Sequence, residues 1–170
     1  MNDRISQVGT FKIVKASASD MADVLAFIKL LADFEKAPDE VIVTERQLIN
    51  DGFGDVPRFE VYLAKDESNN DETVGLCFFS YKYSTWKGLS LYLEDLFILE
   101  KARRNGIAKE FIRLLCLKAK DMGCQRFEWQ VLDWNQPAID FYKQIGVTLD
   151  PEWINVRMTP KEIDSFLERD

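Results

Sequence analysis

The sequence predicts a mixed α/β fold, in which a mostly antiparallel sheet carries flanking helices and one β-α-β unit. Two observations support this fold class. Apolar residues recur at strand-like or helix-like spacing in the order β-α-α-β-β-β-α-β-α-β-α along the chain. Short connections join the middle strands, which favours antiparallel pairing, and a helix separates two later strands, which favours a parallel pair.

The first third of the chain is predicted to hold one strand and two helices. Residues 11–16 alternate as a strand does, and residues 17–36 carry an apolar stripe at helical spacing. A shorter helix is expected over residues 44–52, because Thr44 and Gln47 have the spacing of a capping box.

Three strands are expected in the middle of the chain. They span residues 59–64, 73–83 and 89–99. Residues 65–72 are polar and turn-rich, as in an exposed hairpin loop, and residues 84–88 join the second and third strands. Both connections are short enough for antiparallel neighbours.

The last third alternates helices with strands. A helix is expected from Ile107 to Met122, where apolar residues recur every three or four positions and Gly123 suits a C-terminal cap. Asn135 is a candidate N-cap for a helix that stops at Gly146. The remaining expected elements are strands over residues 126–132 and 153–158 and a helix over residues 159–167.

Length and composition limit the classes of function. The 170 residues predict a flexible N-terminus over residues 1–10 and a single domain over residues 11–170. The formal net charge of −7 disfavours nucleic-acid binding and is compatible with a small cationic substrate, although acidic surfaces are also ordinary. No apolar run approaches the ~20 residues of a membrane span. The three cysteines form no CxxC motif, which favours reduced thiols in a cytoplasmic protein.

The chain contains no histidine, and this excludes several kinds of catalysis. Ser-His-Asp and Cys-His nucleophilic sites are impossible, and so are zinc sites that depend on imidazole. Acid-base chemistry must therefore use carboxylates, tyrosine, lysine, cysteine or water.

Residues 102–111 resemble an anion-binding loop at the start of a helix. The first N–H groups of a helix lack internal partners and carry a partial positive charge, which binds phosphates. Arg103 and Arg104 add charge, Gly106 allows close approach of the backbone, and Ala108 is small. The alternative is that the arginines are simply solvated and Gly106 only starts the helix.

Two further features suggest chemistry. Glu94 and Asp95 interrupt an apolar strand, and because neighbours on a strand face opposite ways, one is expected to point inward and the other outward. The alternative is that these acids are charged residues of an edge strand or form an internal salt bridge. Tyr142 lies on the helix after the next strand, where packing in the core is the alternative to catalysis.

Together these segments resemble the GNAT superfamily of N-acetyltransferases. Residues 103–108 (RRNGIA) fit its R/Q-x-x-G-x-G/A loop, and the order of elements matches over nearly the whole chain. The segments DFEK, DGFG, YSTWKG, YLED and VLDWNQPAIDFY are similar to the diamine acetyltransferase branch, which contains spermidine/spermine and thialysine acetyltransferases. The segments STWKG, FEK and VLDWNQ are more similar to the thialysine enzymes. The sequence still leaves open whether the substrate is a polyamine or thialysine.

The resemblance implies a fold with a central parallel pair of strands that splay apart around acetyl-CoA, and no metal. Tyr142 would protonate the departing thiolate, and Glu94, through a water, would deprotonate the amine for direct attack in a ternary complex. Arg104 stands where many relatives have glycine. The residues implied to bind the cofactor are Leu96, Phe97, Ile98, Arg103, Arg104, Asn105, Gly106, Ile107, Ala108, Lys109, Asn135, Gln136, Pro137 and Ala138.

The resemblance also implies a substrate site and a homodimer. The partners expected are a small cationic amine and a second copy of the chain, with no nucleic acid and no membrane. Two alternatives stay open, a catalytically silent acetyl-CoA sensor and a protein Nε- or Nα-acetyltransferase. The residues implied to contact the substrate are Phe34, Glu35, Glu94, Glu128, Trp129, Gln130 and Glu152.

Overall fold

The computed structural model describes residues 4–169 and divides the chain into two compact units. The first unit ends at Gln130 and the second begins at Val131. Within the described residues, no helix is long and apolar enough to cross a membrane.

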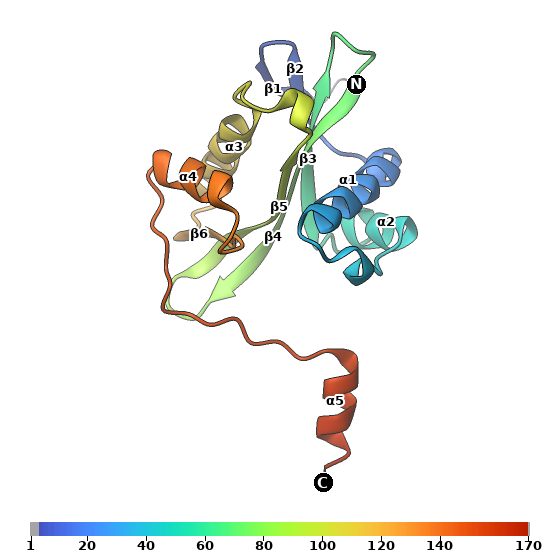
Figure 1. Ribbon diagram of the computed structural model, residues 1–170, viewed down its shortest axis with the longest axis vertical. Helices are drawn as coiled ribbons and strands as arrows, with labels where there is room; N and C mark the ends of the chain where they lie inside the picture. Colours follow the sequence, from blue (N-terminus) through green and yellow to red (C-terminus); the bar gives the residue numbers. More distant parts are fainter. Residues whose placement is uncertain (1–3, 170) are drawn as a thin grey trace. The chain divides into compact units, whose positions relative to one another are not determined.

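A mixed six-stranded sheet forms the first unit, with its strands in sequence order (Figure 1). Neighbours from β1 to β5 are antiparallel, and β5 pairs with β6 in parallel, so the expected α/β class is confirmed. The strands are β1 (Arg4–Val8), β2 (Phe11–Lys15), β3 (Phe59–Asp66), β4 (Glu72–Ser84), β5 (Gly88–Ile98) and β6 (Arg126–Trp129).

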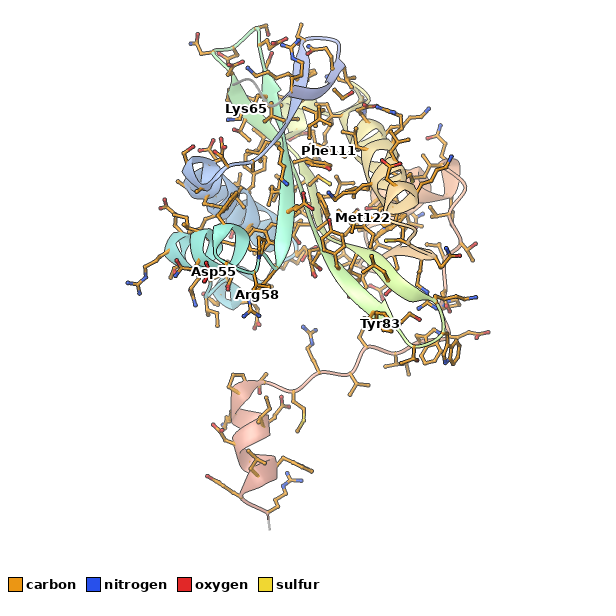
Figure 2. The ribbon with its side chains drawn as sticks, turned by 180° about the vertical axis from the view of Figure 1, so that it is seen from behind. Asp55, Arg58, Lys65, Tyr83, Phe111 and Met122 are labelled. Carbon is orange, nitrogen blue, oxygen red and sulfur yellow. The ribbon has the colours of Figure 1, made fainter. Side chains whose placement is uncertain are left out.

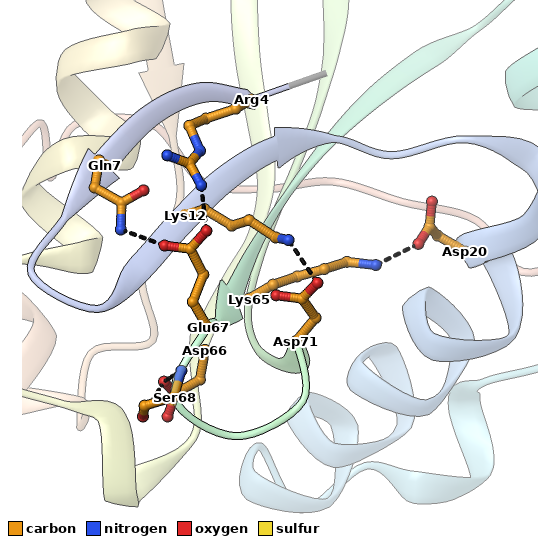
Figure 3. A network of polar contacts seen from close by, with 9 residues as sticks. All are labelled: Arg4, Gln7, Lys12, Asp20, Lys65, Asp66, Glu67, Ser68 and Asp71. Carbon is orange, nitrogen blue, oxygen red and sulfur yellow. Dashed lines mark hydrogen bonds and ion pairs between the residues drawn. The ribbon is translucent and has the colours of Figure 1, made fainter. Parts of the chain in front are cut away.

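The first strand lies in the segment that the sequence predicted to be flexible. β1 turns back at Gly9, whose φ of 56° suits a tight turn, and then pairs with β2. Polar contacts attach this hairpin to the β3–β4 connection (Figure 3). Arg4 and Gln7 both bind the carboxylate of Glu67, and Lys12 pairs with Asp71 at 2.6 Å. Such polar side chains give no apolar signal, which is why the sequence did not predict the strand.

The helices of the first unit cover both faces of the sheet. In Figure 1, α1 and α2 lie on one face and α3 on the other. Apolar side chains of α1 and α2, among them Val24, Phe27 and Leu48, form one core with Val61 and Leu63 of β3. The helices are α1 (Met21–Phe34), α2 (Glu45–Phe53) and α3 (Ile107–Asp121), with short 3₁₀ turns at Ala18–Asp20, Pro38–Glu40 and Glu100–Ala102.

The helix ends agree with the capping signals of the sequence. Thr44 and Gln47 form the expected capping box of α2, in which the Gln47 N–H donates to the Thr44 hydroxyl at 3.3 Å. Gly106 precedes α3 with a φ of 86°, and Gly123 follows it with a φ of 69°. Local chemistry therefore determines where these helices begin and end.

The second unit contains two helices and a long extended segment. These helices are α4 (Gln136–Gln144), capped by Asn135 as expected, and α5 (Pro160–Leu167), capped by Thr159. The strand expected over residues 153–158 is absent, because no backbone ladder pairs with this segment in the described part of the chain. As a result, the parallel β5–β6 pair lies at the edge of the sheet and not at its centre. β6 also ends at Trp129, earlier than expected.

Candidate active site

A cavity of about 370 Å³ opens in the first unit, between α1 and α2 and the sheet. Its volume lies within the range of small-molecule sites. Apolar and polar side chains both line the wall. The apolar group consists of Ile28, Val43, Leu48, Phe59 and Phe78, and the polar group of Asp51, Arg58, Ser80, Glu94 and Asp95.

A β-bulge in β5 places two carboxylates in this cavity. Leu93 pairs with Phe79 of β4 and Asp95 pairs with Phe78, so Glu94 is an extra residue without an opposite partner. The extra residue reverses the alternation of side chains after it, and both Glu94 and Asp95 line the cavity. The expectation that the two acids face opposite sides of the sheet is therefore wrong, because it assumed a regular strand.

Two other carboxylates, those of Glu94 and Glu35, act on the Asp95 carboxylate in the cavity lining. Burial, followed by the negative charges of Glu94 and Glu35, raises the pKa of Asp95 to about 6. Partial burial also raises the pKa of Glu35, which caps the C-terminal end of α1. The Ser80 hydroxyl donates a hydrogen bond to Glu94 at 3.0 Å. This cluster disfavours a further negative charge and would be stabilised by a cation.

The start of α3 has the features of an anion site. Arg104 has a φ of 63° and Gly106 a φ of 86°, so the loop turns sharply before the helix begins at Ile107. The first amides of α3 have no carbonyl of their own helix to bind. Arg103, Arg104 and Lys109 are exposed beside them. Ala108 follows in the first turn, and the Asn105 amide donates to the Ala102 carbonyl at 3.3 Å, which stabilises the loop.

The outer edge of β5 is open between the acidic cavity and this loop. Pairing of β5 with β6 ends at Leu93 and Trp129, whereas β5 continues along β4 to Ile98. Leu96 and Phe97, two of the residues expected to bind the cofactor through their backbone, lie in this stretch. The Ile98 carbonyl accepts a hydrogen bond from the Arg103 side chain at 3.0 Å. The β5–β6 ladder thus ends before Leu96 and Phe97 are reached, and the role of these residues in cofactor binding stays a prediction.

The other expected site residues divide between the two units. Phe34 is an exposed residue at the end of α1, Trp129 ends β6, and Gln130 follows the strand. Glu128 is ion-paired with Lys82 at 2.9 Å and with Arg126 at 3.3 Å, and these basic partners hold its pKa below the usual range despite burial. Its carboxylate is therefore already neutralised.

Tyr142 and the other C-terminal residues belong to the second unit. Tyr142 is 7% exposed in α4, and its ring lies 5.4 Å from that of Phe141. Asn135 accepts a hydrogen bond from the Ala138 N–H at 3.3 Å, and Gln136 and Pro137 form the first turn of the same helix. Glu152 is exposed, and its N–H donates to Asp150 at 3.1 Å. That these residues meet Glu94 stays a prediction.

The structure adds residues that the sequence did not select. Asp95, Ser80, Asp51 and Arg58 all line the cavity. The only sequence signal for Asp95 was its position next to Glu94 in an apolar strand. The bulge that turns both side chains toward the cavity arises from pairing with β4, so the sequence of β5 alone shows no pattern for it. Asp51 and Arg58 come together through the fold of the α2–β3 connection.

The chain is similar to known proteins over most of its length. The model of the acetyltransferase (GNAT) family matches residues 25–147. The chain is 36% identical over 154 residues to thialysine N-epsilon-acetyltransferase of Mus musculus, which covers 86% of this chain and 91% of the mouse protein. It is 32% identical over 147 residues to spermidine/spermine N(1)-acetyltransferase-like protein 1 of Homo sapiens, which covers 84% of this chain and 21% of the human protein.

A solved structure supports the fold. An integron cassette protein from the mobile metagenome of V. cholerae superposes with a TM-score of 0.75 at 22% identity, and the match covers 94% of this chain and 98% of that protein. On the strength of the family match and the identity to the mouse enzyme, the chain belongs to the GNAT acetyltransferase family, in its thialysine and polyamine branch, and is an N-acetyltransferase.

Proposed function

We propose that the chain transfers the acetyl group of acetyl-CoA to a primary amine of a small cationic substrate, in one step within a ternary complex. The observation that carries this proposal is the acidic cavity on β5, which adjoins the open edge of the same strand. A cation held by Glu94 and Asp95 would lie beside the β5 backbone after Leu93, which does not pair with β6. GNAT enzymes use acetyl-CoA as their cosubstrate.

The residues at the start of α3 fit a diphosphate group. Amides without helical partners, the positive φ values of Arg104 and Gly106 and the exposed cations Arg103 and Lys109 together form a positive concave loop. The backbone of Leu96 offers N–H and C=O groups to an extended amide chain along the edge of β5. When bound there, acetyl-CoA supplies the thioester carbon that the amine attacks.

Glu94 is proposed to take the proton that the amine must lose before it can attack. An alkyl ammonium has a pKa near ~10.4, so it arrives protonated at neutral pH. Glu94 is exposed to water and accepts a hydrogen bond from Ser80, which orients its carboxylate. A water molecule between the amine and Glu94 would relay the proton. Asp95 and Glu35 add negative charge that holds the cation in place.

Tyr142 is proposed to donate a proton to the sulfur as the thiolate leaves. A phenol has an ordinary pKa near ~10 and is protonated at neutral pH, so it can act as the acid. Backbone N–H groups on the free edge of β5, near Leu96, would stabilise the negative oxygen that develops on the carbonyl. No covalent intermediate with the enzyme is required.

One assay tests this function. The protein is mixed with acetyl-CoA and, in turn, thialysine, lysine, ornithine, spermidine, spermine or a lysine peptide, and thiol release is followed. We expect turnover with a free diamine-like substrate and a loss of roughly 10²-fold or more in kcat for Tyr142→Phe. Tyr83→Phe, an exposed tyrosine at the end of β4, is the matched control.

The same assay separates the alternatives. Binding of acetyl-CoA without thiol release from any amine would favour a silent sensor, and release with the peptide alone would favour a protein acetyltransferase. Full activity of Tyr142→Phe would refute its assignment as the proton donor. Isothermal titration calorimetry with coenzyme A tests the loop at the start of α3 directly. No heat of binding would contradict its proposed role as the diphosphate site.

We also propose that the chain is a homodimer in the cytoplasm. The resemblance to the diamine acetyltransferases is the first support for the dimer. Trp153, Ile154 and Val156 are the second, because each is at least 74% exposed in the extended segment after α4. A second copy of the chain would bury such side chains. The three free cysteines are compatible with a reducing compartment.

A further inference from the structure

One end of the acidic cavity carries a pair of opposite charges. Arg58 and Asp51 both line the cavity, and the Arg58 Nε atom lies 3.2 Å from the Asp51 Oδ1 atom. Their side chains are 77% and 49% exposed, whereas Asp95 is partly buried, so the pair lies on the solvent side of the cavity. Figure 2 shows Arg58 beside the C-terminal end of α2.

The backbone fixes this pair in place. The Arg58 N–H donates to the Asp51 carbonyl at 2.8 Å, which closes the connection between α2 and β3. Gly52 packs so closely against the ring of Phe59 that a Cβ atom there would lie 2.8 Å from it. Both charged residues are therefore attached to a tightly closed turn at the cavity and not to a free loop.

A guanidinium at this position conflicts with a substrate that carries only positive charges. A diamine or polyamine would bring an ammonium group toward Arg58 and be repelled. A diamino acid carries one ammonium on its side chain, and an α-carboxylate and α-ammonium at its other end. That pattern matches the lining of the cavity, which holds the carboxylates of Glu94 and Asp95 and, in the Arg58–Asp51 pair, a cation beside an anion.

We propose that Arg58 binds the α-carboxylate and Asp51 the α-ammonium group of a diamino acid, and that this pair selects diamino acids over diamines and polyamines. The inference rests on the proposed function and names the substrate class of the same site. Arg58 uses Nε toward Asp51, so its two terminal nitrogens can form the bidentate contact that carboxylates favour. The exposed Arg58–Asp51 pair contributes little by itself, so a ligand can share it at small cost.

The test compares substrates that differ only in the α-carboxylate. The matched pairs are ornithine with 1,4-diaminobutane, lysine with 1,5-diaminopentane, and thialysine with bis(2-aminoethyl) sulfide. We expect the wild-type kcat/KM to be roughly tenfold or more higher for the diamino acid of at least one pair, since a charge-assisted contact contributes about that factor.

Arg58→Met keeps an unbranched apolar stem similar to that of arginine and removes the guanidinium charge. It should lower kcat/KM for the diamino acid by roughly tenfold, mainly through KM, and leave or improve that for the matched diamine. Arg58→Lys should restore part of the preference, because it keeps the charge but not the planar fork. Arg46→Met, in the exposed face of α2 and outside the cavity lining, is the control and should change neither rate.

The outcomes separate this inference from the proposed function. A wild-type preference for the diamine in every pair, or an equal loss for both members in Arg58→Met, would overturn the inference while thiol release still supports an amine acetyltransferase. No thiol release from any amine would overturn both. If Arg58→Met unfolds, Asp51→Asn should raise KM for the diamino acid alone, and an unchanged KM would overturn the inference.

Discussion

At the scale of single residues, the carboxyl group of Asp95 has the most perturbed environment among the acids of the cavity. Its pKa rises to about 6 because the group is buried and because Glu94 and Glu35 add negative charge. The folded chain therefore holds a proton on Asp95 over a pH range in which the unfolded chain has lost it. Stability falls as the pH rises through that range.

Asp95→Asn should accordingly stabilise the free protein at neutral pH. The native pKa of about 6 exceeds the ordinary value of 3.8, so the charged form weakens folding by on the order of 3 kcal/mol at pH 7. The advantage of the variant should shrink as the pH falls from 6 to 4 and vanish below that. Urea unfolding across this range measures it, with exposed Asp55→Asn as the control. A gain that does not change with pH would contradict the electrostatic explanation.

Residue patterns in the sequence predicted part of this site and missed the rest for a clear reason. Glu94, Glu35 and the residues of the α3 loop were identified from motifs, whose spacing is local. Arg104 has a positive φ, and this left-handed backbone costs residues other than glycine about 1 kcal/mol. Arg58 and Asp51 were missed because their meeting depends on how the α2–β3 turn closes.

At the scale of elements, strands and helices with local signals were predicted well. The helices of the first unit agree because caps and apolar stripes lie within each segment. β1 was not predicted because polar side chains, which give no apolar pattern, hold it to the β3–β4 connection. The strand predicted at residues 153–158 is absent because an alternating pattern does not by itself provide a neighbouring strand to pair with. Pairing depends on distant segments, which one stretch of sequence does not specify.

The packing of α3 on the sheet leads to a prediction at this scale. A Cβ atom on Gly75 of β4 would lie 2.7 Å from the Cδ1 atom of Ile98, 3.1 Å from the Cβ atom of Ala64 and 3.3 Å from the ring of Phe111 in α3. The tip of Ile98 can rotate away, but Ala64 is part of β3 and cannot. Gly75→Ala should therefore lower the free energy of unfolding by about 1–3 kcal/mol.

Chemical denaturation monitored by circular dichroism measures the effect of Gly75→Ala. Thr85→Ala, an exposed change in the β4–β5 turn, serves as the control and should stay within about 0.5 kcal/mol of the wild type. A neutral Gly75→Ala would mean that α3 and β5 move apart easily and that the close approach seen here is not required.

At the scale of the whole molecule, the fold class and the family followed from motifs spread along the chain. The histidine-free composition excluded whole classes of catalysis before any motif was considered. What the sequence left open was how many copies assemble and where the last segment pairs. Both questions concern contacts between distant segments or between copies of the chain, which local sequence patterns do not specify.

The extended segment after α4 provides a test of assembly. Ile154 is 86% and Val156 91% exposed, and both belong to the alternating stretch that the sequence predicts as a strand. If a second copy covers them, Ile154→Lys with Val156→Lys should convert a dimer to a monomer, because two charges would be buried at the interface. Analytical ultracentrifugation measures the mass, with Lys161→Ala as the control. A wild-type monomer at micromolar concentration would contradict the proposed dimer.

The bulge in β5 has a consequence for how such a site can diversify. The two neighbouring acids share one hollow because the strand contains a single surplus residue, and ordinary replacements of side chains leave that count unchanged. Only gaining or losing a residue between Leu93 and Asp95 would reverse their orientation. Substrate preference can therefore change through point substitutions in the cavity lining, while the direction in which positions 94 and 95 face stays the same as long as the bulge is kept.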